Sequence, residues 1–203
     1  MRSRGWPVEL TEGQVGLRPL KRSDSVVWRR ARLRNEQWLR PWEATAPAAD
    51  TEPSPTFFGM VAKFRAEARQ GRALPFAITY DGVLVGQLTV GGITYGSARS
   101  GYIGYWIDEA VAGRGIVPTA VAMAVDHCFG VMGLHRLEIS IRPENAASLR
   151  VVEKLGFRCE GPRERFLHID GDWRDHVTYA VTAEEVLPDG LLARWRSSRA
   201  ANS

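Results

Sequence analysis

A short glycine loop is the part of this sequence best suited to bind a ligand. The stretch DEAVAGRGIVPTAV, Asp108–Val121, places Gly113 and Gly115 on either side of an arginine, after a strand-like run and before a helix-like run. In such a loop, successive backbone N–H groups and the positive end of a helix dipole converge on one point, and glycine permits close approach. The arrangement favours a phosphate-bearing ligand, although two glycines at the start of a helix can also form a simple turn.

Two common nucleotide-binding patterns do not fit this loop. Pro118 occupies the position at which the dinucleotide pattern GxGxxG requires its third glycine. The pattern GxxxxGK[ST] requires a lysine that this loop lacks. The loop therefore belongs to neither of these nucleotide-binding classes.

The periodicity of the apolar residues predicts the elements that position the loop. A helix is expected from Val26, and the helix after the loop should bury one apolar stripe from Val117 to Cys128. The other expected helices are 57–70 and 145–156, and the expected strands are 15–20, 76–80, 83–90, 102–108, 137–141, 165–169 and 172–181. We expect a single domain over residues 1–203, with a core at about 15–182 and a loose basic tail at about 189–203.

Composition limits the remaining possibilities. The 203 residues are 44% hydrophobic and 25% charged, which is typical of a globular protein. The N-terminus has no apolar segment of signal-peptide length, and apolar residues nowhere form a membrane-spanning run, so we expect a soluble cytoplasmic protein without a membrane partner. The net charge of +4 favours anionic partners such as phosphates or RNA.

The order of elements and several motifs resemble the GNAT acetyltransferase superfamily. AGRGIV, Ala112–Val117, is similar to the family loop Q/R-x-x-G-x-G/A, with departures at its first and last residues. RPENAASLRVVEKLGF, Arg142–Phe157, is similar to the segment N-x-x-[SA]-x-x-x-[YLV]-x-x-x-G-F. The stretch Gly156–His176 and LRPWE, Leu39–Glu43, resemble the ribosomal-protein-alanine N-acetyltransferase branch, and the whole resemblance spans about residues 15–182.

This resemblance implies the fold and the coenzyme. The fold class is α/β (α+β), with a mixed, mostly antiparallel central sheet of about six to seven strands and helices on both faces. Acetyl-CoA is the implied cosubstrate, without a metal, and its pyrophosphate is bound largely by main-chain N–H groups of the loop. The implied coenzyme-binding residues are Trp106, Ile107 and Asp108 on the strand, Gly113, Arg114, Gly115, Ile116 and Val117 in the loop, and Asn145 and Ser148.

Acetyl transfer to an amine requires a proton donor for the leaving thiolate and a neutral amine. Ser148 lies on the inward stripe of its helix and is a candidate proton donor, while Asn145 is expected to cap that helix and to contact the coenzyme. Glu138 and Glu109 are candidate bases, and either can instead be a solvated residue. A strong base is not essential, because an α-amino group has a pKa near 8, compared with about 10.4 for lysine.

The acceptor site is expected on the early helices and the loop that follows them. In the GNAT family this region usually forms the acceptor wall, which assigns Asn35, Trp42 and Glu43 to substrate binding. Glu43 would attract the incoming ammonium group, and Trp42 would pack on the first side chain. Alternatively, Trp42 anchors the loop in the core and Glu43 is solvated.

Two other clusters invite functional interpretations. The segment HIDGDWRDH, His168–His176, contains potential metal ligands, but an Asp-Gly hairpin turn explains it better because strand alternation distributes them over two faces. The arginine-rich segment Trp28–Arg34 suggests RNA or ribosome contact, although charge runs usually form solvated helix faces.

The sequence thus favours an enzyme that transfers an acetyl group from acetyl-CoA to the N-terminal α-amine of a protein. A ribosomal protein that begins with alanine is the expected acceptor. The alternatives are acetylation of a small-molecule amine, such as an antibiotic or polyamine, and a non-catalytic CoA-binding protein associated with RNA or the ribosome.

Overall fold

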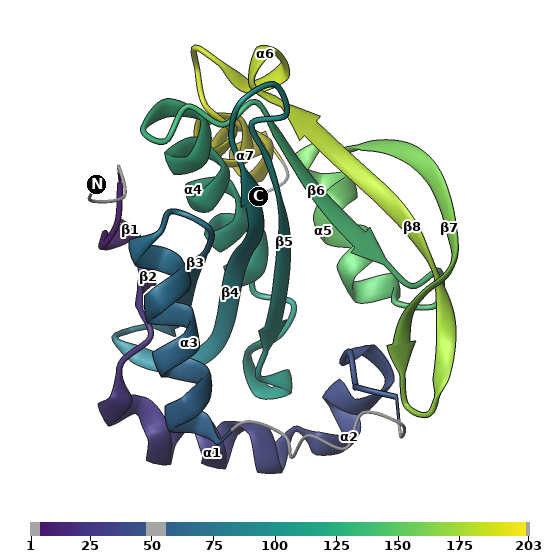
Figure 1. Ribbon diagram of the computed structural model, residues 1–203. Helices are drawn as coiled ribbons and strands as arrows, with labels where there is room; N and C mark the ends of the chain where they lie inside the picture. The colour runs from purple at the N-terminus through teal and green to yellow at the C-terminus, as the bar shows by residue number, and fades with distance from the viewer. Residues whose placement is uncertain (1–4, 48–55, 202–203) are drawn as a thin grey trace.

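An open, strongly twisted sheet of eight strands forms the centre of the protein (Figure 1). The structure is a computed structural model that describes residues 5–47 and 56–201. The strands are β1 Leu10–Glu12, β2 Val15–Pro19, β3 Leu74–Tyr80, β4 Val83–Thr94, β5 Ser100–Ile107, β6 Arg136–Ile141, β7 Arg158–Ile169 and β8 Asp172–Thr182. Their order is β1-β2-β3-β4-β5-β6-β8-β7, and only the β5–β6 pair is parallel. The mostly antiparallel sheet is confirmed, with eight strands in place of the expected six to seven.

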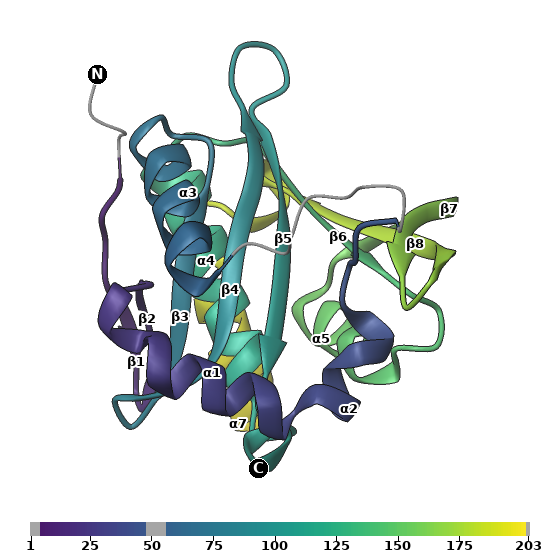
Figure 2. The ribbon, with the colours of Figure 1, turned by 60° about the horizontal axis from the view of Figure 1, so that its bottom comes forward.

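Helices cover both faces of the sheet, as expected (Figures 1 and 2). They are α1 Ser25–Arg34, α2 Glu36–Leu39, α3 Phe57–Arg69, α4 Ile116–Gly130, α5 Ala146–Leu155, α6 Ala183–Val186 and α7 Leu191–Ala201, with short 3-10 turns η1 Arg22–Asp24, η2 Arg40–Trp42 and η3 Glu109–Val111. On one face, α1 and α3 pack over a small apolar cluster that includes Phe57 and Val61. On the other face, α4, α5 and α7 cover a larger core that includes Phe76 and Leu88.

Strands β5 and β6 separate after a short parallel pairing. Ser100–Tyr102 pairs with Arg136–Glu138, and beyond these residues β6 continues beside β8 while β5 turns away from it (Figure 1). From Ile103 onward, β5 has strand β4 along one edge, and among the described residues no strand pairs with its other edge. The sheet is therefore open in its middle, directly before the glycine loop.

The C-terminal segment differs from the sequence prediction. The tail expected to be loose from residue 189 contains α7, whose Leu191 and Trp195 are buried against α4; residues 202–203 lie outside the described residues. Packing of α7 against α4 also overturns a second prediction, that α4 buries only one apolar stripe. Thirteen of the fifteen residues of α4 are buried, because α7 covers the side that would otherwise face water.

Strand β7 is also longer than expected. The sequence predicts this strand only at 165–169, whereas it begins at Arg158 and contains two bulges. Its first half is mostly exposed at the sheet edge, so the alternation of apolar and polar residues that marks a half-buried strand is missing. This half of the strand carries charged side chains that form ion pairs, such as Arg158 with Glu160.

Candidate active site

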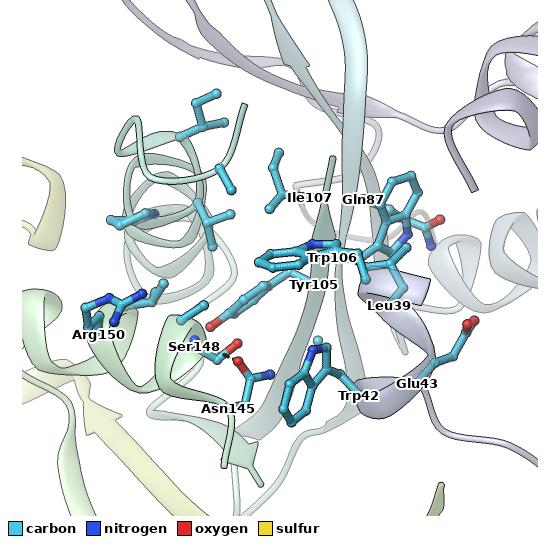
Figure 3. Close-up of a pocket in the computed structure, with 18 of the residues that line it drawn as sticks. Leu39, Trp42, Glu43, Gln87, Tyr105, Trp106, Ile107, Asn145, Ser148 and Arg150 are labelled. Atoms are coloured by element: carbon cyan, nitrogen blue, oxygen red, sulfur yellow. Dashed lines mark hydrogen bonds between the residues drawn. The ribbon is translucent and has the colours of Figure 1, made fainter. Parts of the chain in front are cut away.

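A cleft of about 750 Å³ occupies the opening between β5 and α5 (Figure 3). Its walls are the free edge of β5, the loop before α4, the first turns of α5, and the segment from α2 to residue 44. The volume is typical of a small-molecule site. The fold thus brings most of the residues singled out from the sequence to one place.

The glycine loop has the conformation expected for an anion site. Gly113 has a φ of +82° and Gly115, the N-cap of α4, has a φ of +79°, which is a backbone region that favours glycine. The first N–H groups of a helix have no partner within the helix, so those of Ile116 and Val117 remain available, and Pro118 carries none. Both glycines, Ile116 and Val117 line the cleft.

The side chain of Arg114 does not line the cleft, although the loop around it does. Arg114 is exposed, and its guanidinium points back along the loop, 3.5 Å from the carbonyl oxygen of Ala110. A contribution of this residue to coenzyme binding through its backbone N–H stays a prediction.

Asp108 was expected to bind the coenzyme through its backbone, and the structure contradicts this. Its N–H donates to the Val85 carbonyl in β4 at 2.8 Å. Because backbone groups along a strand alternate between its two edges, the N–H of Ile107 faces the opening in place of that of Asp108. Trp106 and Ile107 line the cleft as expected, whereas the Asp108 side chain is buried.

Asn35 was assigned to acceptor binding, and this prediction was wrong. Its amide nitrogen donates to the Ala31 carbonyl at 2.8 Å and to Asp108 Oδ1 at 3.0 Å, while its oxygen accepts from the Glu109 N–H at 2.9 Å. The side chain is only 2% exposed. It ends α1 and ties this helix to the end of β5, so its hydrogen-bonding groups are not available to an acceptor.

The buried Asp108 carboxylate is kept ionised by its partners. Burial by itself raises the pKa of Asp108, but hydrogen bonds from Arg34 and Asn35 outweigh burial, and the pKa is lowered overall. The Arg34 Nε lies 2.8 Å from the carboxylate. Asp108 thus connects the first helix to the coenzyme strand and does not take part in binding itself.

Asn145 caps α5, as predicted. Its Oδ1 accepts a hydrogen bond from the Ser148 N–H at 3.0 Å, and both residues line the cleft (Figure 3). The Ser148 side chain points toward the hydroxyl of Tyr105 on β5 (Figure 3). Of the first N–H groups of α5, those of Ala146 and Ser148 have partners in the Glu144 carbonyl and Asn145 Oδ1, so this end of the helix presents the Ala147 N–H and the Ser148 hydroxyl to the cleft.

Tyr105 is a site residue that the sequence reasoning missed. Burial raises the pKa of Tyr105 to about 12, with the Ser148 hydroxyl acting in the opposite direction. Its hydroxyl oxygen is buried and makes no hydrogen bond of standard geometry to another described residue. Tyr105 lines the cleft and its hydroxyl lies beside Ser148, so the two hydroxyls together suit a coenzyme sulfur or carbonyl. The sequence did contain a signal for Tyr105, because it shares one face of strand β5 with Ile103 and Ile107 at a spacing of two residues.

The two candidate bases do not lie in the cleft. Glu109 is exposed on η3 and does not line the cavity. Glu138 lies beside Tyr102, where β5 and β6 still pair, and forms ion pairs with Arg136 at 2.9 Å and Arg163 at 3.1 Å. Neither residue is brought together with Ser148, so the assignment of both as catalytic bases is corrected.

The carboxylates that do line the cleft are already paired. Glu43 forms an ion pair with Arg32, whose guanidinium lies 5.6 Å from the Trp28 ring centre and 5.4 Å from that of Trp106. Glu144 is the second carboxylate that lines the cleft, and it forms an ion pair with Arg142 at 3.2 Å. The structure offers no carboxylate base without a cationic partner among the described lining residues.

Trp42 and Glu43 line the cleft on the side opposite α5 (Figure 3). Residue Trp42 lies on η2, a short turn that is fixed to neighbouring elements. Arg142 donates to the Pro41 carbonyl at 2.8 Å and stacks 5.5 Å from the Trp42 ring centre. Arg40 pairs with Asp170 of the β7–β8 hairpin at 2.8 Å. We call η2 and residues 43–44 the acceptor wall, after the role that the family resemblance predicts for this segment.

The acidic and histidine residues of the β7–β8 hairpin bind protein groups. Asp170 pairs with Arg40, Asp175 accepts from the Arg165 N–H at 2.7 Å, and His168 contacts the Thr45 hydroxyl. Among the described residues, no group of three or more potential ligands is placed to hold a metal ion.

The helices of residues 5–47 and 56–201 include none with the length and apolar character that a membrane span requires.

Two further cleft residues, Arg150 and Lys154, were not singled out from the sequence. Both are on α5 and line the same cavity as the glycine loop. Their cationic groups suit the phosphates of a coenzyme. They share one face of α5 at i, i+4 spacing, and this spacing was the signal available in the sequence.

The splayed sheet, the glycine loop and the hydroxyl groups opposite it define a coenzyme-dependent acyltransferase. Residues 14–158 match the family model described as Acetyltransferase (GNAT) domain, and the chain belongs to this family. It is an acetyl-CoA-dependent N-acetyltransferase of the RimJ-type branch.

Three similar proteins support this assignment. Mycobacterium smegmatis RimJ in complex with CoA-disulfide has 42% sequence identity and a TM-score of 0.88, covering 98% of each chain. The [Ribosomal protein uS5]-alanine N-acetyltransferase of Escherichia coli (strain K12) is 30% identical over 171 residues, 81% of this chain and 87% of that protein. Probable N-acetyltransferase YjcK of Bacillus subtilis (strain 168) is 39% identical over 101 residues, about half of each protein (50% and 56%).

Replacing Gly115 by valine should weaken acetyl-CoA binding by at least about tenfold, because a Cβ disfavours the φ of +79° and the added side chain would extend toward Trp195, so the loop backbone would have to shift. Gly82→Val is the matched control: Gly82 has a φ of +77° in the β3–β4 turn, outside the cleft, with open space around it. Calorimetric titration with acetyl-CoA measures both variants. Equal affinity in Gly115→Val and the wild type would contradict the loop assignment.

Ser148→Ala should lower kcat by about tenfold or more with little change in acetyl-CoA affinity, because its hydroxyl matters when the thiolate departs. Tyr105→Phe tests the neighbouring hydroxyl. If both hydroxyls serve the same sulfur, the double variant should lose less than the product of the single effects. Steady-state kinetics and calorimetry separate kcat from affinity. An unchanged kcat in Ser148→Ala would remove this residue from the mechanism.

Proposed function

We propose that this enzyme acetylates the N-terminal α-amine of a protein, and that a ribosomal protein beginning with alanine is the acceptor. The acceptor wall carries the proposal: it places the Trp42 ring and the Glu43 carboxylate across the cleft from Ser148. An aromatic surface suits a small first side chain, and a carboxylate attracts the amine. The E. coli relative, whose name specifies alanine of ribosomal protein uS5, supports the same class of acceptor, which is consistent with a cytoplasmic enzyme.

The reaction can be followed through the residues of the cleft. The neutral amine attacks the thioester carbonyl, a C–N bond forms and the C–S bond breaks. A backbone N–H on the free edge of β5 is placed to donate to the developing oxyanion. The Ser148 hydroxyl delivers a proton to the leaving thiolate, the nitrogen releases its proton to water, and water returns a proton to Ser148. No carboxylate base is needed, because an appreciable fraction of an α-amine is neutral near pH 8.

The charges of the cleft favour a peptide end over a polyamine. The described lining residues include three cationic side chains, Arg32, Arg150 and Lys154, and two carboxylates, Glu43 and Glu144. Both carboxylates already have arginine partners. A polyamine brings several ammonium groups that would need further anionic partners, whereas a peptide end brings one.

Release of free thiol from acetyl-CoA tests the proposal. We expect release with an alanine-initiated ribosomal-protein peptide and none with the same peptide acetylated at its N-terminus. Release only with spermidine or an aminoglycoside would overturn the proposal in favour of small amines. RNA binding without thiol release would instead indicate a non-catalytic role.

Glu43→Gln should raise the KM for the alanine-initiated peptide by about three- to tenfold, because Arg32 would then repel the incoming ammonium without compensation. Affinity for acetyl-CoA should not change. Glu36→Gln, an exposed carboxylate on α2 that does not line the cleft, is the control. Steady-state kinetics at two salt concentrations measures the effect. The same KM in Glu43→Gln and the wild type would leave this side chain without a role in acceptor binding.

A further inference from the structure

The C-terminal helix α7 lies directly against the coenzyme loop. This helix is outside residues 14–158, the part of the chain that matches the family model. It begins where the Asp126 carboxylate of α4 accepts hydrogen bonds from the N–H groups of Leu191 at 2.6 Å and Leu192 at 3.0 Å. From there α7 runs along α4 toward the loop (Figure 2). None of the described residues of α7 lines the cleft.

A chain of two hydrogen bonds, one buried and one part-buried, connects α7 with the loop. The indole N–H of Trp195 donates to the Thr119 hydroxyl at 2.9 Å. That hydroxyl in turn donates to the carbonyl oxygen of Gly115 at 2.8 Å, and the Thr119 backbone N–H donates to the same oxygen at 3.1 Å. Trp195 is 7% exposed and Thr119 is 2% exposed, so water does not compete effectively for these groups.

The indole also forms the outer surface of the loop. A Cβ atom built on Gly115 would lie 3.5 Å from Cζ2 of Trp195 and 4.0 Å from the guanidinium carbon of Arg199. Trp195 therefore acts on the Gly115 peptide both through Thr119 and by direct packing. Gly115 is the residue whose positive φ turns the backbone into α4 and directs the following N–H groups at the cleft.

We propose that α7 is a positioning element for the coenzyme: the Trp195–Thr119–Gly115 hydrogen-bond chain holds the loop in the conformation that binds the pyrophosphate of acetyl-CoA. A threonine hydroxyl often donates to the carbonyl one turn earlier. Here the hydroxyl also accepts from the indole, which fixes its orientation and leaves its proton for Gly115. The geometry of the loop is thus set before the coenzyme arrives, which lowers the entropic cost of binding.

The test compares variants that keep or remove the hydrogen-bond chain. Thr119→Val keeps the shape of the side chain and removes the hydroxyl, and Trp195→Phe keeps an aromatic ring and removes the N–H. We expect each to raise the Kd for acetyl-CoA by about fivefold, the effect of one net hydrogen bond. Thr119→Ser retains the hydroxyl and should bind acetyl-CoA with an affinity close to that of the wild type.

A control distinguishes positioning from general stability. Leu192→Ala removes apolar contacts of α7 without touching the chain, and should lower the Tm while leaving the Kd for acetyl-CoA within about twofold. The KM for the acceptor and kcat should change little in Thr119→Val. A lower Tm with unchanged coenzyme Kd in both Thr119→Val and Trp195→Phe would overturn the proposal, as would failure of Thr119→Ser to restore affinity. Because the readout is binding of acetyl-CoA alone, the result is independent of the proposed acceptor.

Discussion

The brevity of the β5–β6 pairing is the constraint on which the rest of the structure depends. The parallel register covers only Ser100–Tyr102, and after it β6 continues with β8 as its partner. Backbone N–H and C=O groups need partners, so the free edge of β5 is a ready template for the amide groups of an extended ligand. The pantetheine arm of acetyl-CoA carries such amides. Both helix N-termini of the site, those of α4 and α5, line the same opening.

Much of this arrangement could be predicted because it follows from local signals. The positive-φ glycines, the Asn145 cap and the inward stripe of α5 each depend on a few neighbouring residues, and the structure contains all three. Period-two alternation likewise located the strands that are half-buried. Periodicity failed for α4 and α7, because burial on two sides depends on a partner that is distant in the sequence.

The site residues that were misjudged share a physical cause. Asn35 and Asp108 are polar residues near a ligand site, and composition alone cannot show that they bind each other at 3.0 Å in the interior. Glu138 looked available on an alternating strand, yet Arg136 on the same strand and Arg163 on β7 both form ion pairs with it. Tyr105 was not singled out from the sequence at all. In each case the decisive fact is the identity of the partner, which only the tertiary structure supplies.

The fixation of the acceptor wall has a consequence for how an acceptor is selected. Besides the Arg40 and Arg142 contacts, Ala44 pairs with Ile169 as an isolated bridge, so the wall is held before any acceptor arrives. A surface that is already ordered loses little entropy on binding, and the loss falls almost entirely on the flexible chain end that enters. Immobilising each backbone residue costs about 1–2 kcal/mol. A short cleft contacts only a few residues, so ordering a longer segment of the acceptor would cost free energy without adding contacts. Under the proposed function, a protein acceptor would then be distinguished by its first one or two residues, and the sequence behind them would be free to vary.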